Sequence, residues 1–110
     1  MVENGQAVLD YTRGMDFSAY QSNQMVKDAS ERCLSRLSEA AVKLGSSAEE
    51  LFPDHNWRGI RNLGNILILR HDYSNVLDVA VWAIVTINLP ALMADLDSFL
   101  GRYPDEQETL

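Results

Sequence analysis

Residues 23–44, NQMVKDASERCLSRLSEAAVKL, decide the fold class. Apolar side chains recur at steps of three and four along this stretch, which places them on one face of an α-helix. Lys27 and the other charged residues occupy the remaining faces, and Gly45 follows as a typical helix stop. The stretch therefore predicts one long amphipathic helix whose apolar stripe is formed by Val26, Ala29, Cys33, Leu37, Ala40 and Leu44.

A second long helix is predicted from Asp78 to Gly101. Asp78 is a suitable N-cap residue, and the same three-four rhythm continues to the end of the segment. Pro90 lies off the apolar stripe and lacks a backbone donor, so we expect a kink near Ile87 or two helices that meet there. The predicted stripe comprises Trp82, Val85, Leu89, Leu92, Leu96 and Phe99.

Shorter helical segments complete the predicted fold. An N-terminal helix ends at Gly14, Asp16 opens a short helix, another stops before Pro53, and the helical period restarts at Trp57. No segment alternates apolar and polar residues long enough to be a strand. We therefore expect an all-α protein, an antiparallel up-and-down four-helix bundle with short extra helices, in which residues 1–104 form one domain and residues 105–110 an acidic disordered tail.

Composition narrows the class of protein. The 110 residues carry a formal charge of −7 and suffice for one domain with a core. Cys33 is the only cysteine, which excludes an intrachain disulfide and a zinc site of several thiolates and suits a reducing, cytoplasmic compartment. The apolar stretch at 79–96 is broken by Asn88, Pro90 and Asp95, so we expect no membrane insertion.

Several stripe positions are aromatic and predict a homodimer that buries them, notably Trp57, Trp82 and Phe99.

Residues 55–73, HNWRGIRNLGNILILRHDY, form a basic island in this acidic chain. Three arginines against Asp72 give the island a charge of +2, whereas residues 1–54 carry −4 and residues 74–110 carry −5. The overall acidity argues against broad nonspecific binding to nucleic acid, because neutralising phosphates requires clustered Lys and Arg. A small local site for an anion is compatible with this distribution.

The island combines residue types that can bind and cleave a phosphodiester. Arg58, Asn62 and Asn65 are spaced to share one helix face, and Arg61 lies four residues before Asn65. A guanidinium suits two-point contact with phosphate, and the imidazole of His71 titrates near neutral pH. His71 can act as general base or acid while an arginine stabilises charge on the phosphate, and this chemistry requires no metal and no cofactor.

A purely structural interpretation of the same residues remains open. The arginines can solvate the exposed helix face and pair with nearby acids, and His71 can cap a helix end. Cys33 lies on the apolar stripe and is interpreted as a core residue. His55 follows Pro53 in a predicted loop, where we expect a solvent-facing or capping residue. The acids considered as arginine partners are Glu49, Glu50 and Asp54.

Separated motifs in the same order make the chain resemble the HepT-like family. They are DYTRGMDF at 10–17, WRGIRN at 57–62, RHDY at 70–73, VW at 81–82 and NLPAL at 88–92. The resemblance implies a helical-bundle homodimer that serves as the toxin ribonuclease of a type VII toxin–antitoxin system. It also implies a partner, an MntA-like nucleotidyltransferase antitoxin that transfers AMP to a tyrosine of the toxin, and RNA as the substrate.

The family motif is Arg, four to six residues, His, any residue, Tyr. By this resemblance His71 is the catalytic histidine and Tyr73 the AMP acceptor. The positions that the motif assigns to arginine hold Gly64, Asn65 and Ile66. A repeated Ile-Leu in NILIL at 65–69 looks like a two-residue insertion, so Arg61 and Arg70 both remain candidates for the catalytic arginine. The alternative to a toxin ribonuclease is a catalytically silent relative that binds the nucleotidyltransferase and presents Tyr73, and the simplest alternative is a helical dimer without an active site.

Overall fold

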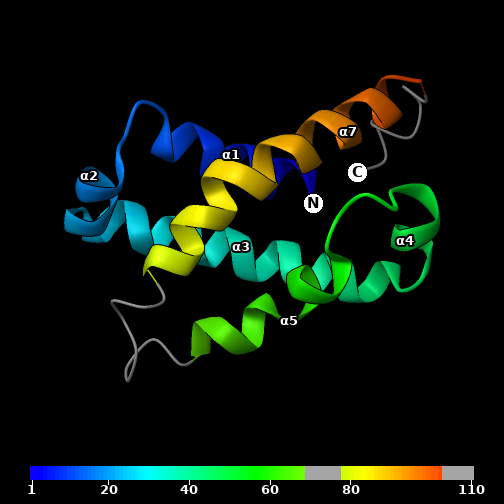
Figure 1. The fold of residues 1–110 in the computed structure, drawn as a ribbon, viewed down its shortest axis with the longest axis horizontal. Helices are drawn as coiled ribbons and strands as arrows, with labels where there is room; N and C mark the ends of the chain where they lie inside the picture. The colour runs from blue at the N-terminus through cyan, green and yellow to red at the C-terminus, as the bar shows by residue number, and fades with distance from the viewer. Residues whose placement is uncertain (69–77, 103–110) are drawn as a thin grey trace.

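The structure is a computed structural model that describes residues 1–68 and 78–102 (Figure 1). Both ranges are helical and contain no strand, which confirms the all-α prediction. The predicted tail at 105–110 and the RHDY motif at 70–73 lie outside the described residues. The helices are α1 (Val2–Thr12), α2 (Phe17–Ser22), α3 (Gln24–Leu44), α4 (Ser47–Leu51), α5 (Trp57–Ile68), and a long helix that starts at 78 and includes the π-helical turn η1 (Ile84–Asn88) and α7 (Leu89–Arg102).

Local capping explains where the early helices begin and end. Asp16 caps α2, since its carboxylate accepts a hydrogen bond from the backbone N–H of Ala19 at 2.8 Å. Asn23 caps α3 in the same way, by accepting from Val26 N at 3.1 Å. Gly45 ends α3 with a φ of 57°, a left-handed conformation that favours glycine. The predicted boundaries at Asp16 and Gly45 are therefore confirmed.

Helix α3 lies at the centre of the fold (Figure 1). It packs against α1 and α5, and α1 also contacts α7. Gly5 permits the close approach of α1 to α7, because a Cβ at this position would overlap the sulfur of Met93. The buried core includes Val8, Tyr20, Leu34, Leu37, Trp57, Leu63, Val85, Leu89, Leu92 and Leu96.

The buried face of α3 differs from the predicted stripe. Leu44 is 43% exposed, whereas Lys27 and two serines are buried. Ser38 explains part of the shift, since its hydroxyl donates to the carbonyl oxygen of Arg61 at 3.0 Å and accepts from Gly64 N at 3.3 Å. The small polar side chain of Ser38 therefore lets α5 pack closely on α3. Ser38 does not belong to the predicted apolar stripe, so the stripe alone places it on another face. The second buried serine of this face is Ser30.

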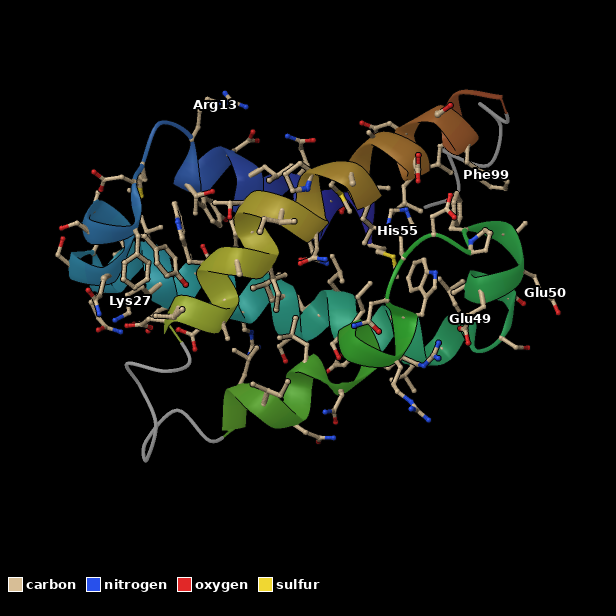
Figure 2. All side chains as sticks on the ribbon, viewed as in Figure 1. Arg13, Lys27, Glu49, Glu50, His55 and Phe99 are labelled. Carbon is tan, nitrogen blue, oxygen red and sulfur yellow. The ribbon has the colours of Figure 1, made fainter. Side chains whose placement is uncertain are left out.

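Lys27 was predicted on a polar face, but its side chain is only 9% exposed. Its Nζ donates to Oδ2 of Asp78 at 2.9 Å and to the carbonyl oxygen of Gln21 at 3.2 Å. Asp78 is itself 2% exposed at its side chain. This buried ion pair joins α3 to the start of the long C-terminal helix (Figure 2).

Pro90 distorts the C-terminal helix as predicted. Proline cannot donate a backbone hydrogen bond, and its ring clashes with the carbonyl of the residue four positions earlier, which here is Thr86. The chain responds by widening into η1, in which the N–H of Leu89 bonds to the carbonyl oxygen of Ile84. The helix thus continues through the proline instead of ending there (Figure 1).

All three aromatic residues that were predicted to lie at a subunit interface make contacts within the chain. Trp57 is 1% exposed, and its indole N–H donates to the carbonyl oxygen of Phe52 at 2.7 Å. The ring of Phe99 lies edge-on to Phe52, with ring centroids 5.4 Å apart. Trp82 stacks near Tyr20, at 5.0 Å between centroids. Other apolar side chains are exposed, among them Val79 at 58% and Ile87 at 69%.

The segment Asp78–Leu100 is long and apolar enough to span a membrane by length and composition. One face of this helix is part of the protein core, through Val85, Leu89 and Leu92. A helix that lines the core of a globular domain satisfies the same criterion.

The Cα radius of gyration is 14.0 Å, close to the value of about 13 Å expected for a compact domain of this length.

Candidate functional site

The candidate site is built on the first two turns of α5. Asn56 caps this helix by accepting a hydrogen bond from Gly59 N at 3.0 Å. Trp57 anchors the same turn in the core, and Ser38 of α3 binds the backbone of the second turn at Arg61. The side chains that point outward from these turns are thus held on a rigid element.

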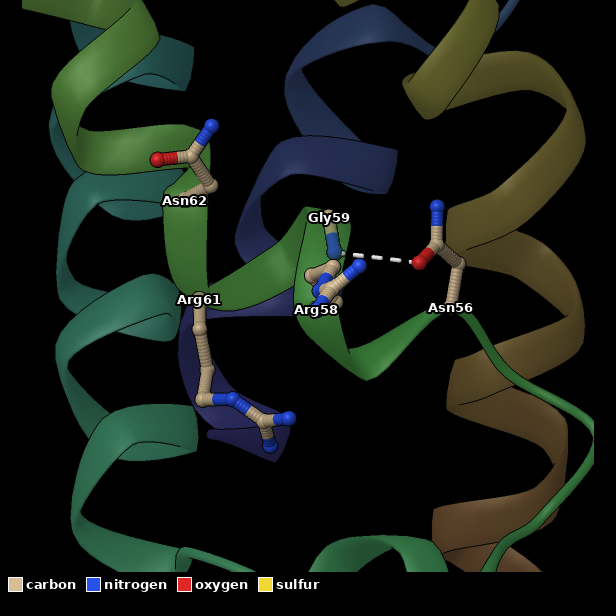
Figure 3. A pocket seen from close by; sticks show the side chains of 5 residues that line it. All are labelled: Asn56, Arg58, Gly59, Arg61 and Asn62. Atoms are coloured by element: carbon tan, nitrogen blue, oxygen red, sulfur yellow. Dashed lines mark hydrogen bonds between the residues drawn. The ribbon is translucent and has the colours of Figure 1, made fainter.

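A surface pocket of about 630 Å³ lies over these turns (Figure 3). Two guanidinium groups and two amides belong to its lining, which offers many N–H donors and contains no acid. Donors in this geometry suit an anion with several oxygens, such as a phosphate. We call this the arginine pocket; it is lined by Asn56, Arg58, Gly59, Arg61 and Asn62.

The two arginines of the pocket differ in their partners. Arg61 is held by Glu49 of α4, with Nη1 at 2.7 Å from Oε1 and Nη2 at 3.1 Å from Oε2. The hydrogen bond from Arg61 lowers the pKa of the Glu49 carboxyl, and the same contact raises the pKa of Arg61. Arg58 is exposed and forms no ion pair with any residue in 1–68 or 78–102.

The purely structural interpretation predicted that these arginines pair with nearby acids. The ion pair between Arg61 and Glu49 confirms this for one of the two arginines. Of the predicted substrate-binding residues, Arg58 and Asn62 line the arginine pocket and Asn65 does not. Asn65 lies beside the pocket, where its amide donates to Oδ1 of Asn62 at 3.1 Å. The remaining predicted site residues lie outside the described residues; they are Arg70, His71 and Tyr73.

His55 lies in the loop before α5, as predicted, but of the two expected roles, solvent-facing or capping, the solvent-facing one is wrong. Its side chain is 10% exposed, and Nε2 lies 2.6 Å from Oδ2 of Asp95 in α7. The ring also contacts Trp57 edge-on, with centroids 6.2 Å apart (Figure 2). Sequence reasoning missed this contact because the two partners are 40 residues apart and no local pattern links them.

An apolar groove of about 590 Å³ adjoins the arginine pocket. It runs between α3, α5 and the C-terminal helix at η1, and it shares Asn56 and Gly59 with the pocket. Polar groups, including His55 and Asp95, lie at one end. Its apolar lining includes Leu34, Leu37, Ile60, Leu63, Ile84, Ile87 and Leu92.

The part of the chain that the structure describes carries His, Cys, Asp and Glu side chains, the usual metal ligands. Within it, no three His, Cys, Asp or Glu residues come together as a metal site. Cys33 is buried on α3, which agrees with its interpretation as a core residue.

Comparison with known proteins shows the family of this chain. The protein named "Putative RNase MJ1380" of Methanocaldococcus jannaschii is 27% identical over 97 residues, which cover 88% of this chain and 87% of that protein. "Putative RNase MJ0127" of the same organism is 24% identical over 108 residues, which cover 98% of this chain and 88% of the relative. No solved structure matches significantly. A model of the family described as "Ribonuclease HepT-like" matches residues 1–99. The chain therefore belongs to the HepT-like ribonuclease family.

Proposed function

We propose that the protein is a metal-independent endoribonuclease and the toxin component of a type VII toxin–antitoxin system, acting in the cytoplasm. The match to the HepT-like ribonuclease family over residues 1–99 carries this proposal, since the matched range includes the RHDY motif. The arginine pocket supports it independently, because it offers donors for a phosphate on the surface of an acidic protein.

The proposed reaction uses the ribose 2′-hydroxyl as an internal nucleophile. The 2′-oxygen forms a bond to phosphorus, the bond to the 5′-oxygen breaks, and the products carry a 2′,3′-cyclic phosphate and a 5′-hydroxyl. His71 acts as general base on the 2′-hydroxyl or as general acid toward the leaving oxygen. Arg61 or Arg70 stabilises the negative charge that develops on the phosphate oxygens. Arg58, Asn62 and Asn65 hold the RNA backbone.

Tyr73 is the proposed acceptor of AMP from an MntA-like nucleotidyltransferase antitoxin. A transferred AMP adds a bulky anion two residues from His71, and it blocks the substrate phosphate by charge and by volume. Each transferred AMP adds about 329 Da to the intact protein, in the manner of other charge-adding modifications.

The proposed assembly is a homodimer of four-helix bundles, each formed by residues 1–104. The apolar groove and the exposed Val79 and Ile87 support it, because a C-terminal helix with uncovered apolar side chains is stabilised by burial against a second copy. Two copies also double the number of arginines near one RNA, which offsets the charge of −7.

A second candidate function is a silent subunit that binds the nucleotidyltransferase and presents Tyr73. The ion pair between Arg61 and Glu49 favours it, since a guanidinium held by a carboxylate is less available to a phosphate. The spacing between Arg61 and His71, which exceeds that of the family motif, favours it as well.

Incubation of RNA with purified protein in EDTA tests the proposed function. Wild-type protein is expected to cleave RNA, and His71→Ala is expected to abolish cleavage without changing the circular dichroism spectrum. Intact RNA after prolonged incubation with folded protein, whose intact mass shows no AMP, would refute the ribonuclease. AMP transfer from a co-expressed nucleotidyltransferase in that case would establish the silent subunit.

A further inference from the structure

Glu49 lies outside the lining of the arginine pocket but binds the guanidinium of Arg61, one of the pocket's donors. Its two oxygens accept from the two terminal nitrogens of Arg61 at 2.7 and 3.1 Å. A phosphodiester presents the same two-point acceptor pattern through its two non-bridging oxygens. Glu49 therefore occupies the donors of Arg61 that a phosphate needs.

The contact is accessible enough to be exchanged. The side chain of Arg61 is 27% exposed and that of Glu49 is 50% exposed, so water and salt reach both partners. Ion pairs with this exposure contribute little to stability, because solvent screens the charges. The structure thus holds Arg61 in place without burying it, and displacing Glu49 leaves a carboxylate that water solvates readily.

The neighbouring arginine makes the exchange favourable. Arg58 lines the same pocket and forms no ion pair with a described residue, so its guanidinium is available to draw an anion to the pocket (Figure 3). A phosphate that enters the pocket can accept hydrogen bonds from Arg58 first. It can accept from Arg61 as well once Glu49 has left that guanidinium. Asn62 adds amide donors to the same lining.

We propose that Arg58 and Arg61 form a subsite for a backbone phosphate of RNA, and that Glu49 is its intramolecular competitor, which leaves Arg61 as the phosphate enters. The proposal rests on the proposed function for the identity of the ligand. It makes Arg61 a phosphate-binding residue and assigns to Glu49 the role of setting RNA affinity and its dependence on salt.

Glu50 provides a matched control. It is the next residue of α4, it is exposed, and it forms no ion pair with any residue in 1–68 or 78–102. Figure 2 shows Glu50 at the outer edge of α4, on the side away from the body of the molecule. Glu49→Gln and Glu50→Gln change the net charge equally, and they differ in whether Arg61 loses its partner.

The test measures binding of a fluorescent 2′-O-methyl oligoribonucleotide, which cannot be cleaved through the 2′-oxygen, by anisotropy across a salt series. In Glu49→Gln the phosphate no longer has to displace a carboxylate from Arg61. Arg61 can then neutralise one more RNA phosphate, and one more counterion is released from the RNA. The slope of log affinity against log salt should steepen by about 0.7, which corresponds to about fivefold tighter binding at 0.1 M salt. Glu50→Gln should leave the slope unchanged.

A double variant isolates the role of Arg61. Glu49→Gln combined with Arg61→Gln should lose the gain and bind as Arg61→Gln alone does. Equal effects of Glu49→Gln and Glu50→Gln, or a gain that persists without Arg61, would overturn the competitor role. If wild-type protein cleaves unmodified RNA while Glu49→Gln leaves binding unchanged, only this inference fails. If no variant binds and wild-type protein does not cleave, the proposed function fails with it.

Discussion

Replacing Lys27 by methionine removes one half of the buried ion pair that ties α3 to the C-terminal helix. Nζ lies 2.9 Å from Oδ2 of Asp78, and the two side chains are 9% and 2% exposed. Methionine retains most of the apolar stem but removes the ammonium group that the Asp78 carboxylate accepts from. Removing one partner of a buried pair costs about 3–5 kcal/mol, whereas a domain of this size has a total stability of about 5–15 kcal/mol.

The expected loss is measurable as a fall in the unfolding temperature. An unfolding entropy of about 2.1 cal/mol/K per residue converts the cost into a decrease of roughly 13–22 °C for 110 residues. Thermal and urea unfolding, followed by circular dichroism, would detect it. The double variant Lys27→Met/Asp78→Leu should unfold at a higher temperature than Lys27→Met, because it removes the buried carboxylate together with the buried ammonium group.

Lys43→Met is the control for this experiment. Lys43 is an exposed lysine in the last turn of the same helix, and its replacement should change stability by about 0.5 kcal/mol or less. A loss below about 1 kcal/mol in Lys27→Met would show that the pair behaves as an exposed one. A double variant less stable than Lys27→Met would show that Asp78 stabilises the fold independently of Lys27.

Three further predictions address the site and the assembly. Asn56→Ala removes the cap of α5 and should cost about 0.5–2 kcal/mol in urea unfolding, while an unchanged midpoint would mean that the hydrogen bond to Gly59 N contributes nothing. Because Arg61 lowers the pKa of Glu49, the stabilisation from this pair is fully present above the ordinary value of 4.5 and is lost as the pH falls through the lowered pKa. The difference in unfolding temperature between wild-type protein and Glu49→Gln should therefore be constant at neutral pH and shrink below 4.5, and a constant difference down to pH 2.5 would contradict the assignment. Ile87→Glu places a charge on the exposed face of η1 and should convert the proposed dimer to a monomer in light scattering, whereas an unchanged dimer would place the interface elsewhere.

Much of the fold follows from local rules. The three-four spacing, Gly45, Asp16 and Pro90 predict the two long helices, their boundaries and the distortion at Ile87, because each of these signals acts within one or two turns of backbone. The prediction of which face of α3 is buried was wrong in part, because burial depends on partners from other elements. The buried Lys27 pairs with Asp78, which is 51 residues away in the sequence, and no periodicity within α3 can reveal that partner.

The candidate site shows the same limit. The spacing of four polar residues, Arg58, Arg61, Asn62 and Asn65, predicts a shared face of α5. The first three line one pocket, whereas Asn65 lies beside it. Glu49 was recognised as one of three acids that an arginine can meet, but the choice among them depends on how α4 packs beside α5. The contact between His55 and Asp95 was missed because it joins two segments that only the tertiary fold brings together.

Analysis of the RNA ends left by wild-type protein in EDTA tests the proposed catalysis most directly. The account predicts 2′,3′-cyclic phosphate and 5′-hydroxyl termini from wild-type protein and none from His71→Ala, with both proteins equally folded. Termini of another kind, equal cleavage by the two proteins, or intact RNA with wild-type protein free of AMP on Tyr73 would contradict it.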